Sequence, residues 1–320
     1  TDKRMSKEKL ILGTRGSDLA LTQTRMVEAI LKAAHPALEC ETKIISTIGD
    51  ERQDLKLTEF AKEQIVDKGI FTKELEVALA AGEVDVAVHS LKDVPTQLDV
   101  EFKLEAVLPR EDTRDALLTK SACTTLAELP KSANLATSSV RRHAQLQWLR
   151  ADLQIEEIRG NVPTRIGKLL QNPSLDGLLL ALAGLRRLGY ISEGETEFGY
   201  EGQTIYVSPL APPDFLPACG QGAIALETRA ADAGTDAILA LINDADTYVR
   251  IDAERMILDR LQAGCHTPVG VDTWLNGEEM SIHLRVFDEN DLTATPKEAR
   301  VSGSRSDVVA LVDQVMDSLE

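Results

Sequence analysis

The sequence VDVAVHSLKDVP, at residues 84–95, joins a short apolar run to a polar loop that holds a lysine and an aspartate. Four further stretches place basic and hydroxyl side chains where an expected strand gives way to an expected helix: GTRGS at 13–17, TSSVRR at 137–142, RGNVPTR at 159–165 and GLRR at 184–187. Alternating strands and helices predict an α/β fold, whose ligands bind at the carboxyl ends of the strands. Helix N-termini at that edge favour anions.

The charge of the chain makes these five basic stretches informative. The 320 residues carry a formal charge of −17, so clustered cations run against the composition and predict a small or medium polyanion as ligand. Aromatic residues make up only 4%, which, with the acidic balance, argues against nucleic-acid binding through stacking or a broad basic face.

No membrane segment is expected, because the longest apolar run, at residues 178–183, is far shorter than the roughly 20 residues that cross a bilayer. The first residues lack the apolar core of a secretory signal. We therefore expect a cytoplasmic protein, or one of the plastid stroma if a transit peptide was removed. Four widely spaced cysteines and five scattered histidines predict neither a disulfide framework nor a metal site.

Length alone suggests roughly two domains. Hydrophobic periodicity along the chain predicts three modest units. In the first, strands are expected at 9–14, 42–47 and 84–89, a helix at 73–81 and a mobile lid between 50 and 68. In the second, which starts near Asp115, strands are expected at 134–136, 155–158 and 178–182, and helices at 139–149 and 163–170. A return loop at 209–217 then precedes helices at 235–242 and 248–261, several short strands, with 281–287 among them, and a final helix at 308–319.

Each basic stretch also has a simpler interpretation. Taken alone, Arg15 and Ser17 form a turn with a solvated arginine, because the P-loop and dinucleotide patterns are absent. The hydroxyls of residues 137–139 cap a helix as readily as they bind an anion. Arg141 and Arg142, however, fall in the first turn of the expected helix, where they oppose its dipole and so predict a negative group beside them.

Two residues are candidates for chemistry. Asp93 beside Lys92 is either a surface pair or the one carboxylate among cations, suited to stabilise a developing positive charge or to shuttle a proton. Cys265, in a glycine-proline loop, is either an inert small hydrophobe or a point of covalent attachment. His89 is expected to be a structural histidine with a satisfied ring.

These stretches, together with KGIFTKEL at 68–75, GQGA at 220–223 and GC at 264–265, resemble the porphobilinogen deaminase (hydroxymethylbilane synthase) family closely and in order. The resemblance runs from about Ile11 to Gly270. It implies three α/β domains, two of them like the lobes of periplasmic binding proteins and the third smaller. We expect domain 1 at 1–113 with a return segment at about 218–238, domain 2 at 114–217 and domain 3 at 239–320.

The resemblance also implies an enzyme that joins four porphobilinogen molecules, holds the growing oligopyrrole chain and acts as a monomer. It makes Asp93 the catalytic carboxylate and Cys265 the thioether attachment point of a dipyrromethane cofactor. Side chains expected to bind the cofactor or substrate carboxylates are Arg15, Ser17, Lys68, Phe71, Lys92, Thr137, Ser138, Ser139, Arg141, Arg142, Arg159, Gly160, Arg165 and Arg187. The alternative is a two-lobed, non-catalytic binding protein for a carboxylated or phosphorylated ligand. The third, cysteine-bearing domain and the missing export signal count against it.

Overall fold

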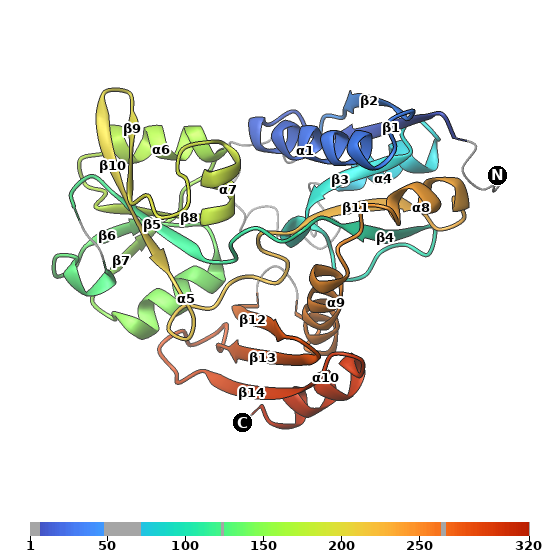
Figure 1. The fold of residues 1–320 in the computed structure, drawn as a ribbon. Helices are drawn as coiled ribbons and strands as arrows, with labels where there is room; N and C mark the ends of the chain where they lie inside the picture. Colours follow the sequence, from blue (N-terminus) through green and yellow to red (C-terminus); the bar gives the residue numbers. More distant parts are fainter. Residues whose placement is uncertain (1–6, 48–71, 123–124, 264–266, 320) are drawn as a thin grey trace. The chain divides into compact units, whose positions relative to one another are not determined.

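The computed structural model describes residues 7–47, 72–122, 125–263 and 267–319 (Figure 1). They fall into two compact units. Unit 1 lies within residues 1–111 and 222–252, and unit 2 lies within residues 112–221 and 253–320. The three domain boundaries expected from the sequence stay a prediction. No helix of the described residues is long and apolar enough to cross a membrane.

Unit 1 is built on a five-stranded sheet with the order β2-β1-β3-β11-β4. The strands are β1 (Lys9–Thr14), β2 (Glu39–Ile44), β3 (Val86–Ser90), β4 (Phe102–Val107) and β11 (Ile224–Arg229), and the helices are α1 (Asp18–Ala34), α4 (Lys73–Ala80) and α8 (Ala233–Leu239). The first four residues of β3 are all buried, as an apolar run in a central strand requires. α1 packs on this sheet through an apolar face that includes Val27 and Leu31.

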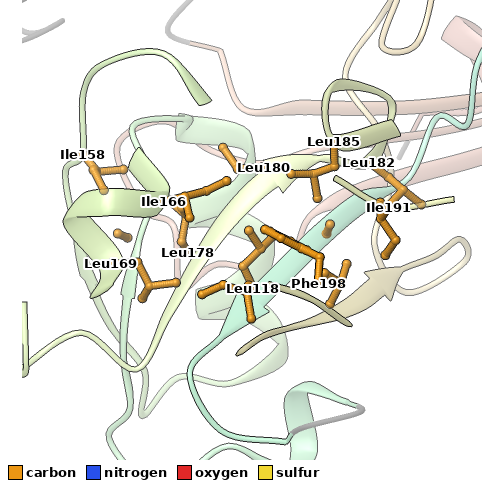
Figure 2. Close-up of a cluster of buried hydrophobic side chains, with 14 of the residues drawn as sticks. Leu118, Ile158, Ile166, Leu169, Leu178, Leu180, Leu182, Leu185, Ile191 and Phe198 are labelled. Carbon is orange, nitrogen blue, oxygen red and sulfur yellow. The ribbon is translucent and has the colours of Figure 1, made fainter. Parts of the chain in front are cut away.

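Unit 2 contains a six-stranded sheet with the order β7-β6-β8-β5-β10-β9. Its strands are β5 (Asp115–Thr119), β6 (Asn134–Ala136), β7 (Gln154–Glu156), β8 (Gly177–Ala181), β9 (Glu197–Tyr200) and β10 (Gln203–Leu210), and its helices are α5 (Val140–Leu149), α6 (Val162–Gln171) and α7 (Leu182–Arg187). Figure 2 shows the apolar cluster where α6 and α7 cover β8, with Ile166 and Leu169 facing Leu178. Gly177 permits close packing in a second apolar cluster of this unit, because a Cβ there would lie 2.8 Å from Leu135 Cδ2 and 2.9 Å from Leu117 Cδ1.

The two sheets repeat one topology. Each has three parallel strands in the order second, first, third, followed by one antiparallel strand and then a further strand. The antiparallel strand is β11 in unit 1 and β5 in unit 2. Each of these strands starts within a few residues of a point where the chain passes from one unit to the other. The expected α/β class with two sheet-centred lobes is thereby confirmed.

The C-terminal part of unit 2 is a smaller antiparallel sheet, as expected. It consists of β12 (Val269–Asn276), β13 (Glu279–Val286) and β14 (Lys297–Ser304), and α10 (Val308–Asp317) packs on it. α9 (Ala245–Arg260) precedes this sheet and includes the boundary between the two units. Ile282, Leu284 and Val312 belong to its apolar core.

Several sequence predictions are wrong in their bounds. β2 lies at 39–44 instead of 42–47, because this edge strand alternates exposed and half-buried residues and carries no apolar run. β8 ends at Ala181, since Leu182 starts α7, and β7 ends at Glu156. β10 continues through Pro209 to Leu210, where a loop was expected. β4, β5, β9 and β11 were not predicted, whereas β12 and β14 fall among the short strands expected in the C-terminal part. The expected lid lies outside the described residues.

Candidate functional site

The carboxyl ends of β1 and β3 lie side by side in unit 1, where Leu12 pairs with Val86 and Gly13 with Ala87. Beside them is a cavity of about 70 Å³ between the β1–α1 turn, α1 and the end of β3. Its lining residues are Arg15, Ser17, Leu19, Ala20, Gln23, Thr72, Val88, His89, Ser90 and Asp93. The structure thus brings together Arg15, Ser17 and Asp93, three of the residues singled out from the sequence. We call this cavity the Asp93 pocket.

Asp93 is presented by a well-anchored turn. It ends the 3-10 turn Leu91–Asp93, in which Leu91 and the following Val94 are buried in an apolar cluster. The side chains of Lys92 and Asp93 between these anchors are exposed. The turn therefore holds a solvated carboxylate at the pocket, while Lys92 is not among the lining residues.

The opposite wall of the pocket is the start of α1. Ser17 caps this helix, since its hydroxyl accepts a hydrogen bond from Ala20 N at 3.3 Å, a role that the sequence analysis did not assign to it. Gln23 and Ser90 exchange two side-chain hydrogen bonds, at 2.9 and 3.1 Å, which tie α1 to the end of β3. The pocket walls are therefore fixed, and the helix N-terminus suits an anionic group.

Sequence reasoning missed the buried acid beside His89. His89 Nε2 lies 2.8 Å from Glu227 Oε2 of β11, and both side chains are almost fully buried. His89 has the satisfied ring nitrogen that was predicted, yet it also lines the pocket. The signal was present in the sequence IALETR at 224–229, where one glutamate follows an apolar run.

A second edge of the same kind lies in unit 2, at the parallel ends of β6 and β7. Thr137 N donates to Glu156 O at 2.9 Å, and Ser138 hydrogen-bonds both N and O of Ile158. Ser139 caps α5 by accepting from Arg142 N at 3.4 Å. The three hydroxyl residues therefore connect two loops and cap a helix, which leaves the anion-binding interpretation open.

The loop after β7 places the next group of expected ligands. Asn161 caps α6, accepting from Thr164 N at 2.9 Å. Gly160 has a φ of +115°, and a Cβ there would lie 2.7 Å from Thr164 Cγ2, so only glycine fits without strain. Arg165 Nε donates to Gly160 O at 2.7 Å, which holds its half-buried guanidinium at this edge. Arg187 is half-buried in the last turn of α7.

The ligand inferred beside Arg141 and Arg142 needs correction. Both side chains are buried, and both guanidinium groups hydrogen-bond the carboxylate of Asp115 on β5, at 2.7 Å from Arg141 and 2.8 Å from Arg142. Arg141 also donates to Leu216 O, and Arg142 to Leu179 O. The negative group demanded by the helix dipole is therefore supplied by a residue of this chain. The cofactor-binding role that the resemblance implies for Arg141 and Arg142 no longer has the dipole argument behind it and stays a prediction.

The charge of Asp115 is secured by its partners. Burial alone acts to raise the pKa of Asp115, but the charges of Arg141 and Arg142 outweigh it and hold the pKa below its ordinary value. Gln221 Nε2 adds a hydrogen bond at 3.1 Å. This cluster is a buried ionic core of unit 2.

The described residues of the unit 2 edge fit a group that carries several carboxylates. Their donors are the hydroxyls of Thr137 and Ser139, the guanidinium groups of Arg159 and Arg165, and the N-termini of α5 and α6. Cys265, Lys68 and Phe71 lie outside the described residues, so their predicted roles stay predictions.

The fold and the two sheet edges define an α/β protein suited to anionic ligands. Residues 10–237 match the family model described as porphobilinogen deaminase, dipyromethane cofactor binding domain, and residues 248–320 match that of the porphobilinogen deaminase C-terminal domain. The chain therefore belongs to the porphobilinogen deaminase family.

Curated relatives agree over nearly the whole chain. Proteins named porphobilinogen deaminase are 39% identical in Trichlorobacter lovleyi, over 98% of this chain and 94% of that protein, and 40% identical in Syntrophus aciditrophicus, over 96% and 94%. The protein of that name in Syntrophomonas wolfei is 43% identical over 85% of this chain and 83% of its own length. Among solved structures, the periplasmic aliphatic sulphonate binding protein SsuA from Escherichia coli matches with a TM-score of 0.39 and 12% identity, over 80% of this chain and 71% of that chain. That score is too low to support an argument.

Proposed function

We propose that this chain joins four porphobilinogen molecules head to tail, releases ammonia at each step and liberates hydroxymethylbilane in tetrapyrrole biosynthesis. Family membership over most of the chain supports this activity. The structural observation that carries it is the Asp93 pocket, which combines one exposed carboxylate with Arg15 and a capped helix N-terminus. A non-catalytic binding protein would need the anion donors but not the carboxylate.

The pocket residues have distinct proposed roles. The substrate is a pyrrole with acetate, propionate and aminomethyl groups. Arg15, Ser17 and Lys92 are proposed to bind its carboxylates. Each charge-assisted hydrogen bond contributes roughly 1.5–3 kcal/mol. Lys68 and Phe71 are proposed to bind the same substrate.

Asp93 is the proposed catalytic carboxylate. When the carbon–nitrogen bond breaks, ammonia leaves and the remaining azafulvenium is a cation, which an exposed carboxylate stabilises electrostatically. A carbon–carbon bond then forms to a pyrrole α-carbon, and that carbon loses its proton. Asp93 assists this proton transfer. The attacking atom is a substrate carbon, so the reaction needs no nucleophilic serine or cysteine.

The six-stranded sheet edge of unit 2 and the C-terminal part of the same unit are proposed to hold the dipyrromethane. When bound, this group supplies the pyrrole α-carbon to which the first substrate unit is joined. Cys265 is the proposed thioether attachment point, and the proposed carboxylate ligands are Thr137, Ser138, Ser139, Arg159, Gly160, Arg165 and Arg187. A three-domain organisation, a cytoplasmic location and a monomeric state are parts of the same proposal.

Intact mass with an assay of porphobilinogen consumption tests this function. The purified protein should exceed its sequence mass by two pyrrole units and should consume porphobilinogen. Cys265→Ser should lose the mass excess and the aldehyde colour reaction of dipyrromethanes, whereas the control Cys219→Ser should keep both. An adduct that persists in Cys265→Ser and disappears in Cys219→Ser contradicts the assignment of the thiol.

A further inference from the structure

Two buried carboxylates lie behind the Asp93 pocket, and the proposed chemistry uses neither. The first is Glu227 of β11, whose side chain is fully buried. One of its oxygens pairs with His89 Nε2, and the other, Oε1, has no hydrogen-bond partner among the described residues. An ionised carboxylate in this state is costly, because burial removes its hydration and only one donor compensates.

The second carboxylate is Glu76 of α4, which packs on β1, β3 and β11. Glu76 is 7% exposed, and its Oε1 accepts a hydrogen bond from Thr72 Oγ1 at 3.5 Å. Its Oε2 lies 3.3 Å from the ammonium group of Lys73, which is half exposed. Burial raises the pKa of Glu76, the charge of Glu227 raises it further, and Lys73 opposes both.

Both acids are connected to the pocket through one residue each. His89 contacts Glu227 and lines the pocket, and Thr72 contacts Glu76 and lines the pocket. We call His89, Glu227 and Glu76 the acid cluster. Among the described residues, the other charged groups that face the cluster or the pocket are Arg15, Asp93, Lys73 and the more distant Asp99.

A purely structural role explains this arrangement poorly. Well-packed apolar side chains are often as stabilising as a buried ion pair, and the residues that precede His89 on β3 and Glu227 on β11 are apolar. The bases beside the two acids are one buried imidazole and the half-exposed ammonium group of Lys73. Titratable groups held in this state beside a pocket are typical of functional sites.

We propose that binding of the anionic substrate in the Asp93 pocket is coupled to uptake of one proton by the acid cluster. The inference rests on the proposed function, which supplies a substrate with two carboxylates. Those carboxylates approach a pocket with two acids behind it, and one proton taken up by the cluster reduces the repulsion. His89, Glu227 and Glu76 are then positioning residues that set the charge of the pocket without touching the reacting atoms.

Linkage makes this coupling measurable. A binding step that takes up one proton tightens by up to about tenfold for each unit by which pH falls through the titration range of the cluster. KM should therefore fall on acidification, while kcat at saturating substrate should change little, because the cluster acts on binding.

Calorimetry of the holoenzyme with an unreactive analogue tests the proposal. The probe is the same pyrrole dicarboxylate without its aminomethyl group, titrated at one pH in buffers with different ionisation enthalpies. The slope of the observed enthalpy against the buffer enthalpy gives the number of protons taken up. The wild type should take up a substantial fraction of one proton, and binding without proton uptake overturns the inference.

Proton uptake measured on matched variants shows which residue takes up the proton. Glu76→Gln keeps the shape of the side chain but removes the titrating group, so uptake should disappear and the pH dependence of KM should flatten. Glu83→Gln, which removes one exposed glutamate of the same unit, should behave as the wild type. Uptake that persists unchanged in Glu76→Gln and in Glu227→Gln contradicts the assignment to the cluster. If neither the analogue binds nor porphobilinogen is consumed, the proposed function itself is wrong.

Discussion

The equivalent antiparallel strand of each sheet holds a buried carboxylate, with opposite surroundings. In unit 2, Asp115 of the antiparallel strand β5 meets two guanidinium groups and an amide. In unit 1, Glu227 of the antiparallel strand β11 meets one imidazole, keeps one oxygen without a partner among the described residues and faces a second acid, Glu76. The buried carboxylate of unit 2 thus has two cationic partners, whereas that of unit 1 has one imidazole partner.

The difference separates a structural cluster from one that exchanges protons. Arg141 and Arg142 hold the pKa of Asp115 below its ordinary range, so this charge persists at any working pH. In unit 1, burial raises the pKa of Glu76, which is the direction that the proposed proton uptake requires. Charge count alone does not show which residues bind ligands, since the most conspicuous arginine pair of the sequence has a buried carboxylate partner in the core.

The largest expected effect is on stability, through the buried ionic core of unit 2 formed by Asp115, Arg141 and Arg142. Arg141→Leu should lower the free energy of unfolding by about 3–5 kcal/mol, because it leaves Asp115 buried with less compensation. Arg15→Leu, in the half-exposed turn of unit 1, should change stability by only about 0.5 kcal/mol but weaken substrate binding. Urea unfolding and KM measured on both variants check this contrast. An Arg141→Leu protein as stable as the wild type would return Arg141 to the set of candidate ligands.

The next effect is on turnover. Asp93→Asn should keep binding and stability but lower turnover by about 10²–10³, the usual cost of losing one preorganised electrostatic group. Asp93→Glu, which keeps the charge at a different distance, should retain more activity than Asp93→Asn. Single-turnover deamination, with cofactor loading checked by mass, measures both. Equal rates for the wild type and a loaded Asp93→Asn would move the catalytic role to another carboxylate.

The smallest effect is on the pH dependence of stability, and its sign differs between the units. Asp115 has a lowered pKa, so its stabilisation is present above its ordinary value of 3.8 and is lost as pH falls below it. Glu76 has a raised pKa, so the folded state binds more protons above its ordinary value of 4.5. Acidification from neutral pH towards 4.5 should therefore stabilise unit 1 slightly in the wild type but not in Glu76→Gln. Hydrogen exchange of α4 and β5 amides against pH separates the two units, and the same slope in both proteins would exclude this role for Glu76.

Local signals predicted much of this structure. The apolar run before His89 predicted β3, and the hydroxyl residues at 137–139 predicted a helix start that the structure confirms, with Ser139 as its cap. Edge strands such as β2 were misplaced, because an exposed strand shows no apolar run.

Long-range partners could not be predicted in this way. Arg141 and Asp115 are 26 residues apart, and His89 and Glu227 are 138 apart, so only the sheet topology brings them together. The sequence argument required a negative group beside Arg141 and assigned it to a ligand, because nothing local pointed to Asp115. The Asp93 pocket was predictable in outline, since its residues follow two parallel strands whose carboxyl ends meet.

The most direct test compares the two buried acids by matched neutral substitutions. Asp115→Asn and Glu227→Gln are both measured by urea unfolding and by the pH dependence of KM. Asp115→Asn should lose about 3–5 kcal/mol of stability and keep the wild-type pH dependence, because it leaves two guanidinium groups buried without their counter-charge. Glu227→Gln should lose much less stability and should flatten the pH dependence of KM. A Glu227→Gln protein that is destabilised as strongly as Asp115→Asn, with an unchanged pH dependence, would contradict the distinction between the two units.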